Sequence, residues 1–159
     1  MKLTHVDERG RARMVDVAGK PEAERTATAQ GVVRMSREAF DLVAAQAVAK
    51  GDVLAVAEVA GTMGAKRTGD LIPLCHPLGL DLVRVEAELE PELPGVRITA
   101  TTKVTGRTGA EMEALTAVAV ACLTVYDMVK AVDRGMVIEE VQLVSKTGGT
   151  RGDWSRVES

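Results

Sequence analysis

The longest run of apolar positions lies in the second half of the chain, between Thr108 and Val132. This segment, TGAEMEALTAVAVACLTVYDMVKAV, contains no glycine or proline after Gly109 and is rich in alanine, leucine and methionine. It predicts one continuous helix of roughly six turns, capped by Thr108 with Glu111 following as in a capping box. Because its middle is apolar on almost every side, we expect it to pack on a sheet and on another helix or subunit.

Two further helices are predicted in the first half of the chain. Ser36 caps the segment 36–50, whose apolar residues recur at helical spacing until Gly51 ends the helix. Asp52 caps the segment 52–66, which carries a stripe of small residues suited to close packing. A strand is the alternative for its first half, but strict alternation would leave both faces apolar, so we favour a helix.

Four segments have the pattern of strands. Residues 25–35 combine β-branched and small side chains, with Gly31 as a candidate bulge. Residues 80–90 alternate apolar and charged positions, and residues 96–106 return after a turn, which predicts an antiparallel hairpin. The last strand, residues 136–146, leads into the loop TGGTRGD.

The predicted order is strand, helix, helix, strand, strand, long helix, strand. Helices on one face of a four-stranded antiparallel sheet, in a β-α-β-β-α-β order, indicate an α+β sandwich of the ferredoxin-like class. We expect an irregular arm over residues 1–24, a single domain over residues 25–150 and a polar tail over residues 151–159. Because this fold hosts enzymes, regulatory domains and RNA binders, it does not decide the function.

Composition narrows the classes of partner. The net charge of -3 and the pI near 5.5 argue against binding to nucleic acid or to a membrane surface. Aromatic residues form only 2% of the chain, too few for the stacking platforms of single-strand RNA binders. The two cysteines, with neither a signal peptide nor an apolar span of about 18 residues, predict reduced thiols in a cytoplasmic protein.

The first group of candidate catalytic or binding residues lies in the loop between Lys66 and Pro77. Histidine can transfer protons near neutral pH, and the prolines of this loop would hold His76 in place. A buried belt of charges is an equally good interpretation, and a lone thiol such as Cys75 is more often packing than a nucleophile. The charged and reactive side chains of this loop are Lys66, Arg67, Thr68, Asp70, Cys75 and His76.

The long helix carries a second set of candidates. Asp127 and Lys130 are three residues apart, so their side chains are neighbours, as in an ordinary surface ion pair. We expect partial burial after the apolar run and therefore favour a role in acid and base catalysis. Glu113 lies roughly 21 Å from Asp127 along the helix, at about 1.5 Å per residue, which is too far for both to act on one atom. Either they hold opposite ends of a long ligand or a second subunit intervenes, with the two helices packed antiparallel about a twofold axis.

The loop after the last strand is a weaker candidate. Lys146 and Thr147 precede Gly148 and Gly149. Glycines let backbone amides approach an anion closely, so this loop could hold phosphate, although it lacks the P-loop pattern. A flexible C-terminal loop is the default interpretation.

Taken together, KRTGDLIPLCHPL, the long helix with its continuation DRGM, and SKTGG resemble the molybdenum cofactor biosynthesis protein C family, the cyclic pyranopterin monophosphate synthases. The opening THVDERGRARMVDVAGKPEAERTATAQG and the segment AVAKGDVLAVAEVAG are also similar to that family, so the resemblance covers nearly the whole chain. It implies a cytoplasmic lyase-type enzyme that converts 3′,8-cyclised dihydro-GTP into cyclic pyranopterin monophosphate and releases pyrophosphate. It also implies a homohexamer of three dimers with active sites at the dimer interface.

The same resemblance assigns roles to individual residues. Asp127 would be the catalytic residue, with Lys130 beside it. No motif requires a cofactor, although the triphosphate could bring Mg²⁺, and no carboxylate cluster dedicated to a metal is evident. The residues that would line the substrate are Leu74, Cys75, His76, Met112, Glu113, Lys50, Lys66 and Lys146.

Overall fold

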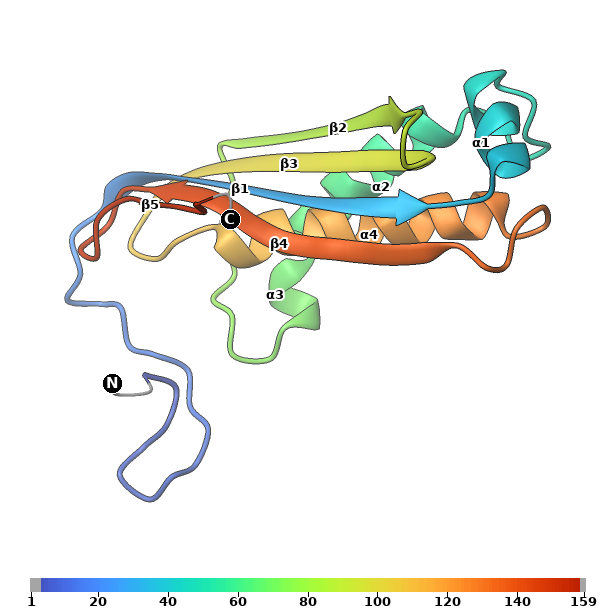
Figure 1. The fold of residues 1–159 in the computed structure, drawn as a ribbon. Helices are drawn as coiled ribbons and strands as arrows, with labels where there is room; N and C mark the ends of the chain where they lie inside the picture. The colour runs from blue at the N-terminus through green and yellow to red at the C-terminus, as the bar shows by residue number, and fades with distance from the viewer. Residues whose placement is uncertain (1–3, 158–159) are drawn as a thin grey trace.

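The computed structural model describes residues 4–157 as a mixed α/β structure built on one antiparallel sheet (Figure 1). The strand order is β2-β3-β1-β4-β5, so β1 lies at the centre between β3 and β4. The strands are β1 (Ala23–Arg34), β2 (Leu82–Glu90), β3 (Gly95–Gly106), β4 (Val137–Thr147) and β5 (Trp154–Ser155).

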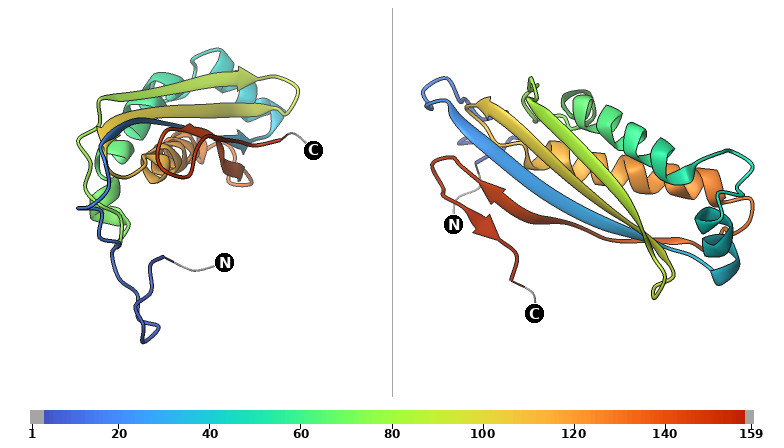
Figure 2. Two further views of the ribbon diagram at one scale, coloured as in Figure 1. Left: turned by 90° about the vertical axis from the view of Figure 1, so that its left-hand side faces the viewer. Right: turned by 90° about the horizontal axis from the view of Figure 1, so that it is seen from above.

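Two long helices cover one face of this sheet. α2 and α4 run antiparallel and side by side behind the strands, and α1 lies at one end (Figures 1 and 2). This arrangement confirms the predicted α+β class. It also confirms the predicted hairpin, formed by β2 and β3, and the long core helix. The helices are α1 (Arg37–Ala44), α2 (Val53–Lys66), α3 (Thr68–Leu71) and α4 (Glu111–Val129).

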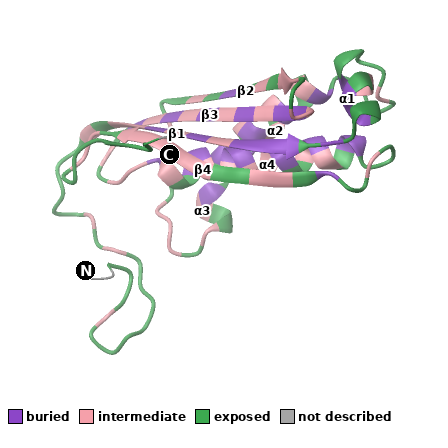
Figure 3. Cartoon of the chain, viewed as in Figure 1, coloured by how far each residue is buried: buried purple, intermediate pink, exposed green. Residues whose placement is uncertain are grey.

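The core lies between the sheet and these helices (Figure 3). Val96, Ile98 and Ala100 of β3 are fully buried at alternate positions, as a half-covered strand requires. α4 adds Ala117 and Ala121 to this core, both fully buried, and α2 packs closely against them at Gly61. α4 is long and apolar enough to cross a membrane, but 56% of its apolar window is buried inside the protein, as in a core helix.

One local prediction is confirmed and another is corrected. The Asp52 side chain caps α2 by accepting a hydrogen bond from the Ala55 amide. The predicted bulge lies on the neighbouring strand: where the pairing of β1 with β4 shifts register between Gln30 and Val32, Glu140 and Val141 of β4 lie opposite Gly31. A Cβ at Gly31 would lie 2.7 Å from Val118 Cγ1, so α4 requires a glycine there.

The predicted bounds of two helices are wrong. The first helix begins after the Ser36 cap but ends at Ala44, because Gln46 turns the chain with φ of 53° well before Gly51. The long helix begins at Glu111 and ends at Val129, and its N-cap is Ala110 with no side-chain hydrogen bond, so the capping box at Thr108 does not form. Glu111 pairs with Lys146 Nζ at 3.2 Å instead of reaching back to Thr108.

The sheet has five strands rather than the four predicted. β5 adds to the edge of β4, with Lys146 opposite Trp154 and Ser145 opposite Ser155. A two-residue strand has too few positions to show alternation, so the sequence pattern does not reveal it. The same applies to α3, a single helical turn inside the loop predicted between Lys66 and Pro77.

Candidate functional site

Three charged side chains meet where α4 ends; Asp127, Lys130 and Lys50 are called the Asp127 end below. One carboxylate oxygen of Asp127 accepts a hydrogen bond from Lys130 Nζ at 2.6 Å, and the other accepts one from Lys50 Nζ at 2.9 Å. Lys50 also donates to the main-chain oxygen of Asp127 at 2.9 Å. The turn between α1 and α2 therefore delivers a second lysine to the predicted pair.

The two ammonium groups keep the Asp127 carboxyl ionised. The hydrogen bond from Lys130, followed by the one from Lys50, lowers the pKa of Asp127 to about 2. The prediction that this pair is partly buried is wrong for the single chain, because the side chains of Asp127 and Lys130 are 56% and 51% exposed.

A second group lies at the opposite end of α4; Cys75 and Glu113 form what is called the Cys75–Glu113 end. Cys75 Sγ donates to Glu113 Oε1 at 3.7 Å, which joins the loop after α3 to the first turn of α4. Glu113 is only 2% exposed, and its Oε2 has no hydrogen-bond partner among the described residues. A buried carboxylate oxygen without a partner is costly, so this position is suited to a ligand donor.

Burial dominates the ionisation of both groups at this end. Loss of water around Glu113 raises the pKa of its carboxyl above the ordinary value. Burial, reinforced by the Glu113 charge, raises the pKa of the Cys75 thiol to about 11. Cys75 is therefore a neutral hydrogen-bond donor near neutral pH, not a thiolate nucleophile.

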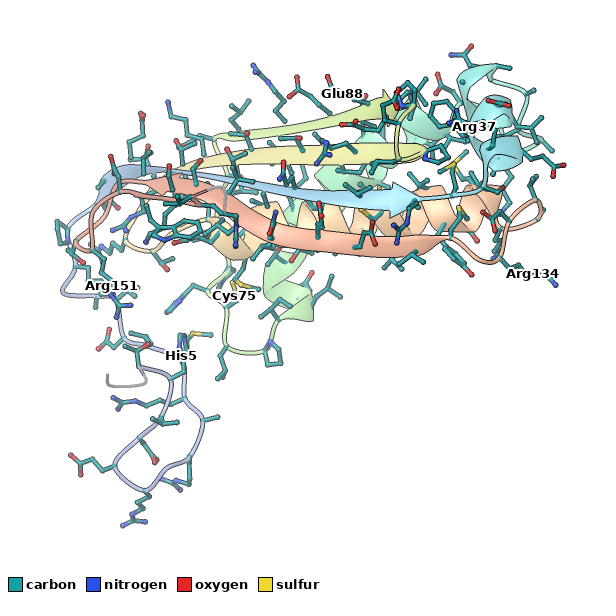
Figure 4. The ribbon with its side chains drawn as sticks, viewed as in Figure 1. His5, Arg37, Cys75, Glu88, Arg134 and Arg151 are labelled. Carbon is teal, nitrogen blue, oxygen red and sulfur yellow. The ribbon has the colours of Figure 1, made fainter. Side chains whose placement is uncertain are left out.

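His76 and Lys146 line a cavity of about 270 Å³ at the same end of the sheet. The loop after β4, the start of β1, the segment before α4 and the N-terminal arm supply its other walls. Figure 4 shows Cys75 on the loop below the start of α4, with Arg151 and His5 on the segments at the left. The predicted anion loop at Gly148 and Gly149 is part of this cavity, and both glycines have positive φ.

Two of the remaining predicted site residues belong to the Cys75–Glu113 end, because Leu74 precedes Cys75 and Met112 precedes Glu113 in the chain. Lys66 ends α2 and lines a separate depression with Leu78, Leu80 and neighbouring residues. Leu74 is half-buried in the loop after α3, and Met112 is 39% exposed on the first turn of α4. The single chain thus does not bring Lys66, Leu74 or Met112 to the Asp127 end.

The two ends of α4 are too far apart to act on one small group. Glu113 and Asp127 both lie within α4, so roughly 21 Å of helix separates them at about 1.5 Å per residue. Lys50 belongs to the Asp127 end, and Lys146 belongs to the Cys75–Glu113 end. The two ends of α4 therefore carry separate groups of side chains with different chemistry.

Sequence reasoning missed several charged residues of the cavity. Arg25, Arg107, Glu111 and Arg151 all line it beside Lys146. These residues come together through the strand pairing, which the sequence pattern does not reveal. β1 pairs antiparallel with both β3 and β4, so the start of β1 lies beside the ends of the other two strands. Among residues 4–157, no group of three or more His, Cys, Asp or Glu side chains is arranged to hold a metal ion.

Comparison with known proteins covers almost the whole chain. The model of the MoaC family matches residues 14–149. Proteins named cyclic pyranopterin monophosphate synthase are 59% identical in Thermomicrobium roseum, over 98% of this chain and 93% of that protein, and 59% in Cereibacter sphaeroides, over 94% of each. The protein of that name in Brucella ovis is 56% identical over 97% of this chain and 93% of its own length. The chain therefore belongs to the MoaC family.

Proposed function

We propose that this protein is a cyclic pyranopterin monophosphate synthase of molybdenum cofactor biosynthesis. It converts (8S)-3′,8-cyclo-7,8-dihydroguanosine 5′-triphosphate into cyclic pyranopterin monophosphate and pyrophosphate, and it acts in the cytoplasm. The observation that carries this proposal is the identity of 56–59% with synthases along nearly the full chain. The order of strands and helices further supports a ferredoxin-like core with β5 as an addition.

The reaction needs both cations and a proton acceptor. A substrate hydroxyl forms a bond to the α-phosphorus while the bond from that phosphorus to the leaving pyrophosphate breaks. The hydroxyl proton must pass to a base, and the negative charge that grows on pyrophosphate needs fixed cations. Opening and closing the rings of the base requires further proton transfers.

In this proposal the Asp127 end carries out the proton transfers. Asp127 accepts protons from the substrate as an ionised carboxylate. Lys130, whose Nζ donates a hydrogen bond to Asp127 at 2.6 Å, gives protons to the substrate. A carboxylate with a pKa of about 2 is a weak base. A substrate phosphate that draws Lys50 away from Asp127 would raise its basicity, because one of the two cations that stabilise the charged form would be lost.

The other predicted residues bind the substrate. His76 and Glu113 hold the base or the sugar, with Cys75, Leu74 and Met112 beside them. The lysines Lys50, Lys66 and Lys146 surround the phosphates as point charges. Mg²⁺ would enter with the triphosphate rather than through a protein metal site, and it would neutralise part of the phosphate charge.

A complete site in this proposal needs two chains. The Asp127 end of one subunit faces the Cys75–Glu113 end of its partner, across a twofold axis that relates antiparallel α4 helices. The separation of roughly 21 Å within one chain, at about 1.5 Å per residue, supports this arrangement. Three such dimers form a homohexamer with six shared sites.

Subunit mixing tests the enzyme and the shared site together. Asp127→Asn and Lys146→Ala are each assayed for pyrophosphate release from the cyclised dihydro-GTP substrate, and then assayed after subunit exchange in a one-to-one mixture. We expect each variant to be inactive and the mixture to recover about a quarter of the wild-type rate, since half of the dimers are mixed and each has one intact site.

Two outcomes would contradict the proposal in different ways. Verified mixed oligomers without recovered activity would show that both residues act within one chain. Wild-type protein that binds the substrate but releases no pyrophosphate would make it a binding protein rather than a synthase. Asp127→Asn and Lys130→Ala, mixed as a matched control, should not rescue each other because both changes affect the same end of α4.

A further inference from the structure

The cavity beside Lys146 carries strongly unbalanced charge. Among the described residues that line this cavity, Glu111 is the only one with a carboxylate. A solvent-open cavity of about 270 Å³ with such a surplus of positive charge favours a small polyanion over a neutral ligand. The cations that line it are Lys20, Arg25, Arg107, Lys146 and Arg151.

Arg25 is fixed before any ligand binds. Its Nε donates to the main-chain oxygen of Gly106 at 3.0 Å, and one terminal nitrogen donates to that of Arg107 at 3.3 Å. The other terminal nitrogen lies against Gly149, where a Cβ would collide with it. The guanidinium therefore keeps its position while several of its five N–H groups remain available for an anion.

Glu111 occupies the cavity as an internal anion. Its Oε1 lies 3.2 Å from Lys146 Nζ, and the two side chains are only 29% and 25% exposed. The other carboxylate oxygen covers the backbone at Gly109, where a Cβ would collide with it. A phosphate that binds Lys146 meets the like charge of this carboxylate at the same ammonium group.

We propose that this cavity binds the diphosphate end of a polyphosphate and that Glu111 is its built-in competitor. The carboxylate holds Lys146 in place when the cavity contains no ligand, and it is displaced when a diphosphate arrives. The inference rests on the proposed function for the identity of the ligand, since that reaction releases pyrophosphate. Glu111 then lowers the affinity of the cavity for free pyrophosphate and assists its release.

The test is calorimetric titration of the full-length protein with inorganic pyrophosphate, first with a chelator and then with Mg²⁺. We expect Glu111→Gln to bind pyrophosphate at least threefold more tightly than wild type, because a competing negative charge is removed at constant shape. Glu111→Ala should show the same gain and serves as a second variant should the glutamine variant unfold.

A double-mutant cycle separates competition from a structural effect. In the Lys146→Ala background, Glu111→Gln should lose most of its gain, because the contested ammonium group is absent. Arg25→Lys should weaken binding of pyrophosphate about tenfold, since lysine cannot reproduce the fixed guanidinium. Pyrophosphate should also inhibit turnover by the Glu111 variants at lower concentration than it inhibits wild type.

Several results would overturn the inference. Unchanged or weaker pyrophosphate binding in Glu111→Gln with chelator present would do so, and so would a gain that persists without Lys146. Weaker binding by Glu111→Gln only when Mg²⁺ is present would make Glu111 a metal ligand instead. Failure of the proposed function is seen separately, because an inactive wild type can still show the complete pattern with inorganic pyrophosphate.

Discussion

At the scale of single residues, Glu113 combines deep burial with an unpartnered oxygen. It is 2% exposed, and burial raises its pKa above the ordinary value of 4.5. A carboxyl whose pKa is raised in the folded state keeps its proton longer than in the unfolded chain. Its contribution to stability is therefore fully present below the unfolded pKa and is lost as the pH rises through the folded pKa.

This sign gives a prediction for Glu113→Gln. The free energy of unfolding of wild type should fall, relative to that of the variant, as the pH rises from about 4.5 towards neutrality. Urea unfolding at equal protein concentration across this range measures the difference. Glu38→Gln, which changes an exposed carboxylate in the first turn of α1, is the control and should track wild type. A difference that does not change with pH would show that folding leaves the pKa of Glu113 unchanged.

Asp127 has the opposite behaviour, because cations rather than burial set its ionisation. Hydrogen bonds from Lys130 and then Lys50 lower its pKa to about 2. We expect the midpoint of its carboxyl titration, followed by carbon NMR in acid, to rise in Lys130→Ala and to rise less in Lys50→Ala. Arg134→Ala, a change in the turn after α4, should leave the midpoint in place. Equal midpoints in wild type and Lys130→Ala would contradict the observed ion pair.

At the scale of elements, the contact between α2 and α4 depends on glycine. A Cβ at Gly61 would lie 2.9 Å from the main-chain oxygen of Ala117 and 3.2 Å from Ala121 Cβ. The obstacle is backbone and a rigid methyl group, so the two helices would have to separate to accept it.

We therefore expect Gly61→Ala to lower the free energy of unfolding even though alanine is the better helix former. Overpacking costs roughly 1–3 kcal/mol, while the gain in helix propensity is about 1 kcal/mol. Urea unfolding of wild type and variant measures the balance. Ala55→Gly, at an exposed position of α2, is the reference for helix propensity alone. It should lower the free energy of unfolding by about 1 kcal/mol or less. A stabilised Gly61→Ala would mean that the helices have room to adjust.

The same elements show how far the sequence could lead. α2 and the β2–β3 hairpin follow from local patterns, because a cap, a period and a turn lie within a few residues of each other. The end of α1 at Ala44 does not follow, since a glutamine in the left-handed region is not signalled by residue type. β5 depends on an open edge of β4, which is a tertiary feature.

Some residues of the candidate site could likewise be predicted from the sequence, and others could not. The neighbouring positions of Asp127 and Lys130 follow from helix geometry, and residue chemistry marked Cys75 and His76. Lys50 joins Asp127 only because the chain turns early after α1. The fixed Arg25 could not be identified without the strand order, because its partners lie about eighty positions away on β3 and beyond.

At the scale of the whole molecule, the helix layer leaves large apolar side chains in water. Val59, Met63 and Leu123 are 62%, 54% and 59% exposed on α2 and α4. Leu123 lies one turn before Asp127 on the same face of α4, so this exposed apolar side chain is next to the Asp127 end. Exposed apolar surface of this kind marks association. Because the proposed site needs both ends of α4, we propose that the partner is a second copy of the chain.

Leu123→Asp tests this assignment. A charge at this exposed apolar position should break the contact, so that light scattering gives a mass below that of wild type and turnover falls with it. We expect wild type to have a mass about six times the 16.8 kDa of the chain, as the proposed hexamer requires. Val157→Asp changes a valine that is 87% exposed in the C-terminal segment, and this control should keep both mass and activity. Circular dichroism checks that Leu123→Asp is folded, and Val59→Asp repeats the test from α2. If both folded variants kept the wild-type mass, this helix face would not be the contact, and another surface would have to bring the two ends of α4 together.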